Sequence, residues 1–79
     1  MNTATQALRS KMESMISSIC GVPCEIAILS HGRLYLSVVM DGNQSVACDK
    51  LQQFFGARFD AYEFDEELDA TYAGIVLEN

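Results

Sequence analysis

The chain has 79 residues, of which 49% are apolar and 20% charged, and its 11 acidic and 5 basic residues give a net charge of −6. This composition is typical of one small globular domain and excludes a disordered chain. The negative charge disfavours nucleic acid and anionic membranes as ligands, because both attract clustered Lys and Arg. A basic partner suits such a chain better, and solubility alone is the alternative reason for its acids.

The first twenty residues are expected to form an amphipathic helix. Thr3 or Thr5 can serve as its N-cap, and Gly21 followed by Pro23 ends it. Polar residues interrupt the segment at every third or fourth position, so we expect neither a secretion signal nor a membrane span, and a cytoplasmic location. The apolar stripe at helical spacing consists of Leu8, Met12, Met15, Ile16 and Ile19.

Two β-rich runs follow in the stretch "CEIAILSHGRLYLSVVMDG", around a tight turn at His31-Gly32. In the first run Ile26 and Ile28 point one way, whereas Glu25 and Ala27 point the other. The second run has apolar residues on both faces, which predicts a central strand. Its alternating sets are Leu34, Leu36, Val38 and Met40 on one face and Tyr35, Ser37 and Val39 on the other.

The segment after the turn "DGNQ" is expected to be a second helix, from Val46 to about Phe55, with Ser45 as N-cap and Gly56 after its end. We expect a strand at 59–64, an acidic turn at 65–69 and a final strand at 71–77. The prediction is therefore a single α+β domain over residues 1–79, in the order α-β-β-α-β-β, with an antiparallel sheet and two helices on one of its faces. The expected buried residues are Leu8, Met12, Ile16, Ile28, Leu36, Val38, Ala47, Leu51, Phe54, Phe55 and Ile75.

The soft metal ligands of the chain are Cys20, Cys24, Cys48 and His31, the number that a structural zinc site needs. Three residues separate the first pair, however, and a turn role accounts for His31. Free cysteine is a common small core residue, so we expect free thiols in place of a zinc site or a Cys20–Cys24 disulfide. A Cys–His nucleophile needs a base held by a third group, so we expect no catalytic residue, no metal, no cofactor and no enzymatic activity.

The segment "FDAYEFDEELDA" threads aromatic and leucine side chains through acids, and no Lys or Arg follows Phe59. It lacks the central glycine of a calcium-binding EF-hand loop. Aromatic anchors ringed by charges are typical of a protein-recognition surface. The alternative is a hairpin that packs Phe59 and Phe64 inward while its acids face water. The expected partner-binding residues, with Tyr62 as central anchor, are Asp60, Tyr62, Glu63, Asp65, Glu66, Glu67 and Asp69.

By its size, its charge, its layout and the stretch "DAYEFDEELD", the chain resembles the small acidic inhibitors of host defence that phages and mobile elements carry, in particular anti-CRISPR proteins and DNA mimics. The resemblance implies that the acids occupy a Lys/Arg surface that a host complex uses for guide RNA, target DNA or nuclease recruitment. It implies a host protein or ribonucleoprotein as partner, no direct binding of nucleic acid or membrane, and the host cytoplasm as location.

Two other resemblances concern parts of the chain. The stretch "LYLSVVMDGNQSVACDKLQQFFGARFDAYEFDEEL" resembles aminoacyl-tRNA editing domains of the prolyl-associated type, with Cys24 and Glu25 near the place of their lysine, which implies a degenerate editing-like domain. Residues 1–40 resemble roadblock-type modules, which implies a structural or homodimeric interaction module.

Overall fold

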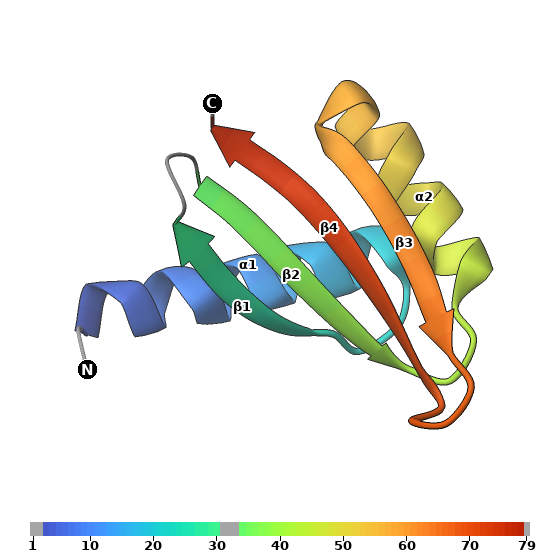
Figure 1. The fold of residues 1–79 in the computed structure, drawn as a ribbon. Coiled ribbons are helices and arrows are strands. Elements are labelled where there is room, and N and C mark those ends of the chain that lie inside the picture. The colour runs from blue at the N-terminus through green and yellow to red at the C-terminus, as the bar shows by residue number, and fades with distance from the viewer. Residues whose placement is uncertain (1–2, 31–33, 79) are drawn as a thin grey trace.

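The computed structural model describes residues 3–30 and 34–78, and Figure 1 shows the order of their elements. The order α-β-β-α-β-β confirms the predicted α+β class. The turn predicted at His31-Gly32 and the side chains of Thr3 and Thr5 lie outside the described parts. The elements are α1 (Thr3–Cys20), β1 (Glu25–Ser30), β2 (Leu34–Asp41), α2 (Ser45–Phe55), the 3₁₀ turn η1 (Gly56–Arg58), β3 (Phe59–Asp65) and β4 (Ala70–Glu78).

The four strands form one antiparallel sheet in the order β1-β2-β4-β3, and both helices lie on the same face of it (Figure 1). The central position predicted for β2 is confirmed, since β2 pairs with β1 on one side and with β4 on the other. The chain places β4 between β2 and β3, so the sheet consists of two hairpins joined side by side. Neither helix in the described part of the chain is long and apolar enough to cross a membrane.

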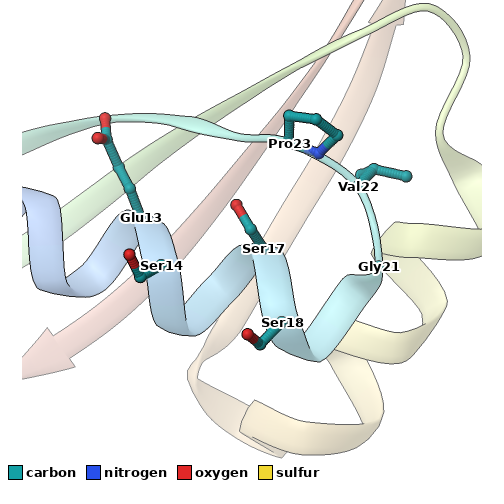
Figure 2. Close-up of a pocket in the computed structure, with 7 residues that line it drawn as sticks. All are labelled: Glu13, Ser14, Ser17, Ser18, Gly21, Val22 and Pro23. Carbon is teal, nitrogen blue, oxygen red and sulfur yellow. The ribbon is translucent and has the colours of Figure 1, made fainter.

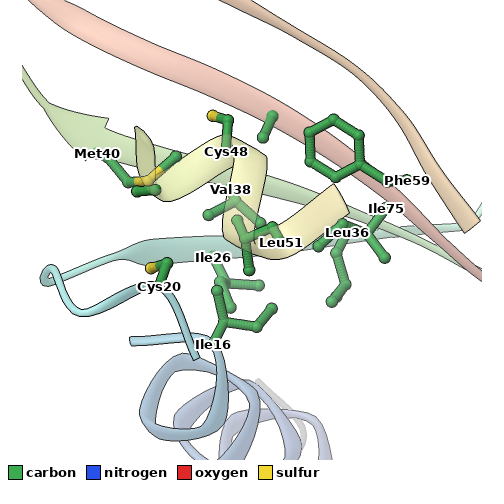
Figure 3. Close-up of a cluster of buried hydrophobic side chains, with 12 residues drawn as sticks. Ile16, Cys20, Ile26, Leu36, Val38, Met40, Cys48, Leu51, Phe59 and Ile75 are labelled. Atoms are coloured by element: carbon green, nitrogen blue, oxygen red, sulfur yellow. The ribbon is translucent and has the colours of Figure 1, made fainter. Parts of the chain in front are cut away.

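The core lies between the helices and the face of the sheet that they cover (Figure 3). Alternate residues of a strand face opposite ways, so β2 gives this face Leu36 and Val38, and β4 gives it Ile75. Leu51 of α2 is fully buried against them, as is Ile16 of α1. The other buried apolar residues are Cys20, Ile26, Met40, Ala47, Cys48, Phe59, Ala70 and Ala73.

Two of the residues expected in the core are exposed, and their assignment was wrong. Leu8 is 40% exposed, because the core residues of α1 lie in its second half and its first turns extend beyond the sheet (Figure 1). Phe54 is 63% exposed, because the side of α2 that meets the sheet is centred on Leu51 and Phe54 lies at its margin. Met12, Ile28 and Phe55 pack on the core while half-buried.

The start of α2 also differs from the prediction, because Gln44 and not Ser45 is the N-cap residue. No side chain caps this end, and the Ser45 N–H donates to Asn43 Oδ1 at 3.3 Å. The predicted end at Gly56 is confirmed: Gly56 has a φ of +59°, which favours glycine, and its N–H donates to the carbonyl of Gln52.

Candidate protein-interaction surface

The acidic segment forms the edge strand β3 and the turn that leads into β4 (Figure 1). A β-bulge interrupts the pairing of β3 with β4, since Phe59 pairs with Ile75 and Ala61 pairs with the next residue, Gly74. After the bulge, Tyr62 pairs with Ala73 on the helix-covered face. The extra residue therefore brings Phe59 onto the same face as Tyr62 and Phe64.

The predicted contact residues are divided between the two faces of the sheet and the turn. Glu63 pairs with Tyr72 and points to the uncovered face, whereas Tyr62 points to the helix side, where its ring centroid is 6.3 Å from that of Phe59. Glu66 and Glu67 are exposed in the turn. The structure therefore wraps these residues around the edge strand and does not gather them around Tyr62, which is 42% exposed.

Two of the predicted contact acids shape the turn itself. Asp65 Oδ1 accepts the backbone N–H groups of Glu67 and Leu68 at 3.0 and 3.1 Å. Asp69 has a φ of +50°, a left-handed conformation that Asp adopts more readily than most residues, and its carbonyl accepts the N–H of Gly42 at 2.7 Å. Both residues therefore have a structural role in addition to their charge, which the sequence pattern did not indicate.

The strands carry negative charge without compensation from basic residues of the sheet. No Lys or Arg falls within the described strands, and their acidic residues are Glu25, Asp41, Asp60, Glu63, Asp65 and Glu78. The basic residues of the described chain are Arg9 and Lys11 in α1, Lys50 in α2 and Arg58 in η1. Arg58 donates a hydrogen bond to the carbonyl of Leu77. The field at the uncovered face is therefore negative.

Tyr35 extends the candidate surface onto that uncovered face, although it is not among the predicted contact residues. Its hydroxyl donates to Asp60 Oδ2 at 3.2 Å, which joins β2 to β3 across β4. A Cβ built on Gly74 would lie 1.8 Å from this hydroxyl oxygen, so glycine at that position lets the phenol lie against β4. In the sequence Tyr35 belongs to the alternating set of the second run that also holds Ser37 and Val39, and this pattern alone did not indicate a contact role.

The three cysteines are free thiols: Cys20 is the last residue of α1, Cys24 follows shortly after it, and Cys48 lies in α2. Cys20 Sγ and Cys24 Sγ lie 3.6 Å apart, and both thiols are directed at the carbonyl of Val22. Burial raises the pKa of Cys24 to about 12, with Cys20 adding to the effect, and burial also raises the pKa of Cys48 to about 11. The thiols of Cys24 and Cys48 therefore stay protonated at neutral pH, which makes them poor nucleophiles. Within residues 3–30 and 34–78 no three His, Cys, Asp or Glu side chains are grouped to hold a metal ion.

Figure 2 shows a hollow beside α1, and two of the polar side chains that line it hold the chain at the start of β1. Glu13 Oε2 accepts the N–H of Ile26 at 3.0 Å, and Ser17 Oγ accepts the N–H of Cys24 at 3.2 Å. β1 is an edge strand, so these two side chains satisfy backbone donors that have no neighbouring strand. The polar face of α1 thus covers the start of this edge.

Comparison of the chain with protein-family models, with curated proteins and with solved structures finds no match.

Proposed function

We propose that this protein is a non-enzymatic, protein-binding inhibitor, similar in action to anti-CRISPR proteins, whose acids occupy a Lys/Arg surface of a host defence ribonucleoprotein. The observation that carries the proposal is the charge distribution of the sheet, with six acidic residues and no basic one in its strands. Such a surface attracts a basic one at long range and repels nucleic acid. The partner's nucleic-acid site is therefore blocked by competition for the same cations.

The turn between β3 and β4 extends this acidic surface beyond the strands. Glu66, Glu67 and Leu68 are exposed there, with Leu68 at 65%. A protruding turn with an apolar residue between acids can enter a basic groove built for a nucleic-acid strand. Exposed charges act mainly on the rate of encounter, and the apolar residue slows dissociation.

The test measures the binding of labelled target DNA to a panel of CRISPR effector complexes while the protein is added at increasing concentration. The wild type should displace or exclude the DNA from at least one complex, and its apparent affinity should fall as salt is raised. The variant Glu66→Lys/Glu67→Lys changes the net charge from −6 to −2. It should inhibit at least about tenfold more weakly, because repulsion replaces attraction at the basic site.

The matched control places the same change in charge on α2. Asp49, Gln52 and Gln53 are exposed, and their replacement by Lys also gives a net charge of −2. This control should inhibit nearly as well as the wild type. Equal loss in both variants would mean that net charge matters and the turn does not. Full activity of the turn variant, or failure of the wild type on the entire panel, contradicts the proposal.

A homodimeric interaction module is the second candidate, and one observation favours it. Val46 and Phe54 are 68% and 63% exposed and lie two turns apart on the same side of α2. Such a stripe can pair with its copy around a two-fold axis. Sedimentation of the wild type and of Phe54→Ser tests it: a dimer that dissociates in the variant supports the module, and a monomeric wild type excludes it.

A further inference from the structure

A row of small residues crosses the uncovered face of the sheet. The strand register places Ala27 of β1 opposite Ser37 of β2, Ser37 opposite Gly74 of β4, and Gly74 opposite Ala61 of β3. Residues that are directly opposite in paired strands share one face, so these four residues lie in one line across all four strands. Larger residues flank the line on both sides.

The flanking residues make the line a trough. Tyr35 and Val76 are paired on one side of it, and Tyr72 lies between its partners Val39 and Glu63 on the other. The Tyr35 phenol lies over Gly74, and beside it there is a hollow of about 220 Å³ that Ser37, Ala61, Glu63 and Tyr72 also line. This volume is below the roughly 300–1,000 Å³ of typical small-molecule sites. The hollow therefore suits one side chain better than a cofactor.

Tyr35 forms one wall of this hollow and is held at its hydroxyl end. Its phenol lies against Gly74 and its hydroxyl donates to Asp60 at 3.2 Å. A ring held at its hydroxyl end loses little conformational entropy when a ligand packs on it. The hollow is thus bounded by an oriented aromatic residue before any partner arrives.

The chemistry around the hollow fits a guanidinium. Aromatic rings attract a cation over their faces, and a guanidinium stacks on them better than an ammonium does because it is planar and weakly hydrated. Its forked N–H groups also match a carboxylate such as that of Glu63. No Lys or Arg of the described strands competes for this position.

The same charges argue against a second copy of the chain as occupant. Two copies packed face to face through the uncovered sheet would bring Asp60 and Glu63 of one against the acids of the other, which is unfavourable. A basic partner is attracted by the same acidic residues that would repel a second copy.

We propose that the hollow between Tyr35 and Tyr72 binds an arginine side chain of the partner protein. This inference rests on the proposed function, because it takes the partner surface to be basic. In this proposal the hollow makes binding specific for arginine, and the acidic turn between β3 and β4 attracts the basic partner at long range.

The direct test titrates the protein with a hexa-arginine peptide and with a hexalysine peptide while the backbone amide and tyrosine ring NMR signals are followed. Hexa-arginine should bind more tightly than hexalysine, and its largest shifts should fall on Ser37, Tyr72 and Gly74. Equal affinity for the two peptides, or shifts confined to the turn, would mean a general acidic surface and overturn the inference. Shifts of these signals with protein concentration alone would show a second copy on this face and also overturn it.

Variants of the lining separate the hollow from general charge. Glu63→Gln and Tyr72→Leu should each weaken hexa-arginine binding at least fivefold, and Ala61→Leu should do so by filling the floor. Glu66→Gln removes the same charge as Glu63→Gln but lies in the turn, so it should weaken binding less than twofold. Equal effects of Glu63→Gln and Glu66→Gln refute the inference, with circular dichroism showing that each variant is folded.

The two proposals fail in different ways. If Glu66→Lys/Glu67→Lys abolishes inhibition of the effector while Glu63→Gln, Tyr72→Leu and Ala61→Leu keep full inhibition, the acidic inhibitor stands and the arginine site is wrong. If hexa-arginine occupies the hollow while no effector is inhibited, the arginine site stands and the inhibitor proposal is wrong.

Discussion

At the scale of single residues, Thr71 is the polar side chain most deeply buried in the described chain, with no exposed surface. Its hydroxyl donates to the carbonyl of Gly42 at 2.7 Å and accepts the N–H of Gln44 at 2.9 Å. The residue thereby joins the start of β4 to the loop that leads into α2. It also supplies a partner for Gln44, the N-cap residue whose helix end lacks a side-chain cap.

Replacement of Thr71 by Val keeps the shape and removes both hydrogen bonds. We expect the free energy of unfolding to fall by about 1–3 kcal/mol, because two partly buried backbone groups lose their partner. Urea denaturation measures this loss, and hydrogen exchange at the Gln44 amide should become faster. Thr71→Ser is the control, since it keeps the hydroxyl and should keep this amide protected. A Val variant with unchanged amide exchange would refute the role of the hydroxyl.

The raised pKa values of Cys24 and Cys48 predict that the free energy of unfolding decreases at alkaline pH. Unfolded cysteines lose their protons near the ordinary pKa of 9.0, whereas Cys48 and Cys24 in the folded chain keep theirs to pKa values of about 11 and about 12. Between these values the folded state holds more protons than the unfolded state, so stability falls as pH rises. The stabilisation that the protonated thiols contribute is fully present below pH 9 and is lost as the pH rises through about 11 to 12.

Urea denaturation at several pH values above neutrality measures this slope. Cys48→Ala should flatten it, because the variant has one buried thiol fewer to ionise. An unchanged slope in the variant would show that other groups cause the alkaline loss.

At the scale of elements, β3 shows where prediction from the sequence reached its limit. Strict alternation from Phe59 would place Tyr62 and Phe64 on the opposite face, and a single extra residue at the bulge reverses this. The register with β4 sets the bulge, and the alternation of residues within β3 does not mark which residue is the extra one. The alternation in β1 and β2, in contrast, was predictable because these strands pair without a register shift and their buried set is uniformly apolar.

In α2 the exposed and buried members of one apolar stripe provide a matched pair. Leu51→Ala should lower the free energy of unfolding by about 2–5 kcal/mol, because it leaves a cavity under the sheet. Phe54→Ala should cost no more than about 1 kcal/mol, since Phe54 is mostly exposed and its main contact is the ring of Phe55 at 5.0 Å. Chemical denaturation of the two variants checks both values, and comparable losses would place Phe54 in the core after all.

At the scale of the whole molecule, negative charge is concentrated on a body of 32 × 25 × 23 Å. Charges repel across such dimensions at about 0.01 M salt, where the Debye length is about 30 Å, and much less at 0.15 M, where it is about 8 Å. We expect the free energy of unfolding to rise with salt over this range, because screening relieves repulsion in the compact state.

Urea denaturation at the two salt concentrations measures this gain. The variant Glu66→Lys/Glu67→Lys, at a net charge of −2, should gain less from salt than the wild type. A wild type whose stability is independent of salt would show that its charges are already well separated in the fold.

The element order and the fold class were predictable, because helical and strand periodicities are local and clear in this chain. The sheet order was not, since either strand of the second hairpin could have paired with β2. Leu36 pairs with Ile75 and Val38 with Ala73, and these contacts between distant residues decide the order. The hollow beside Tyr35 was equally out of reach, because it exists through the register of Ser37, Gly74 and Ala61 across three strands.

The placement of β4 has a consequence for how the protein is made. β4 follows all the other strands along the chain, yet it lies inside the sheet, between β2 and β3. During synthesis, at roughly 5–20 residues per second, β2 has one unpaired edge until β4 emerges from the ribosome. A nascent chain that stops before Ala70 would hold the β1–β2 hairpin and β3 as separate pieces, with Leu36 and Val38 deprived of their partners. The complete sheet can therefore form only after β4 has been synthesised. A protease that removes β4 removes a central strand of the sheet and not an edge strand.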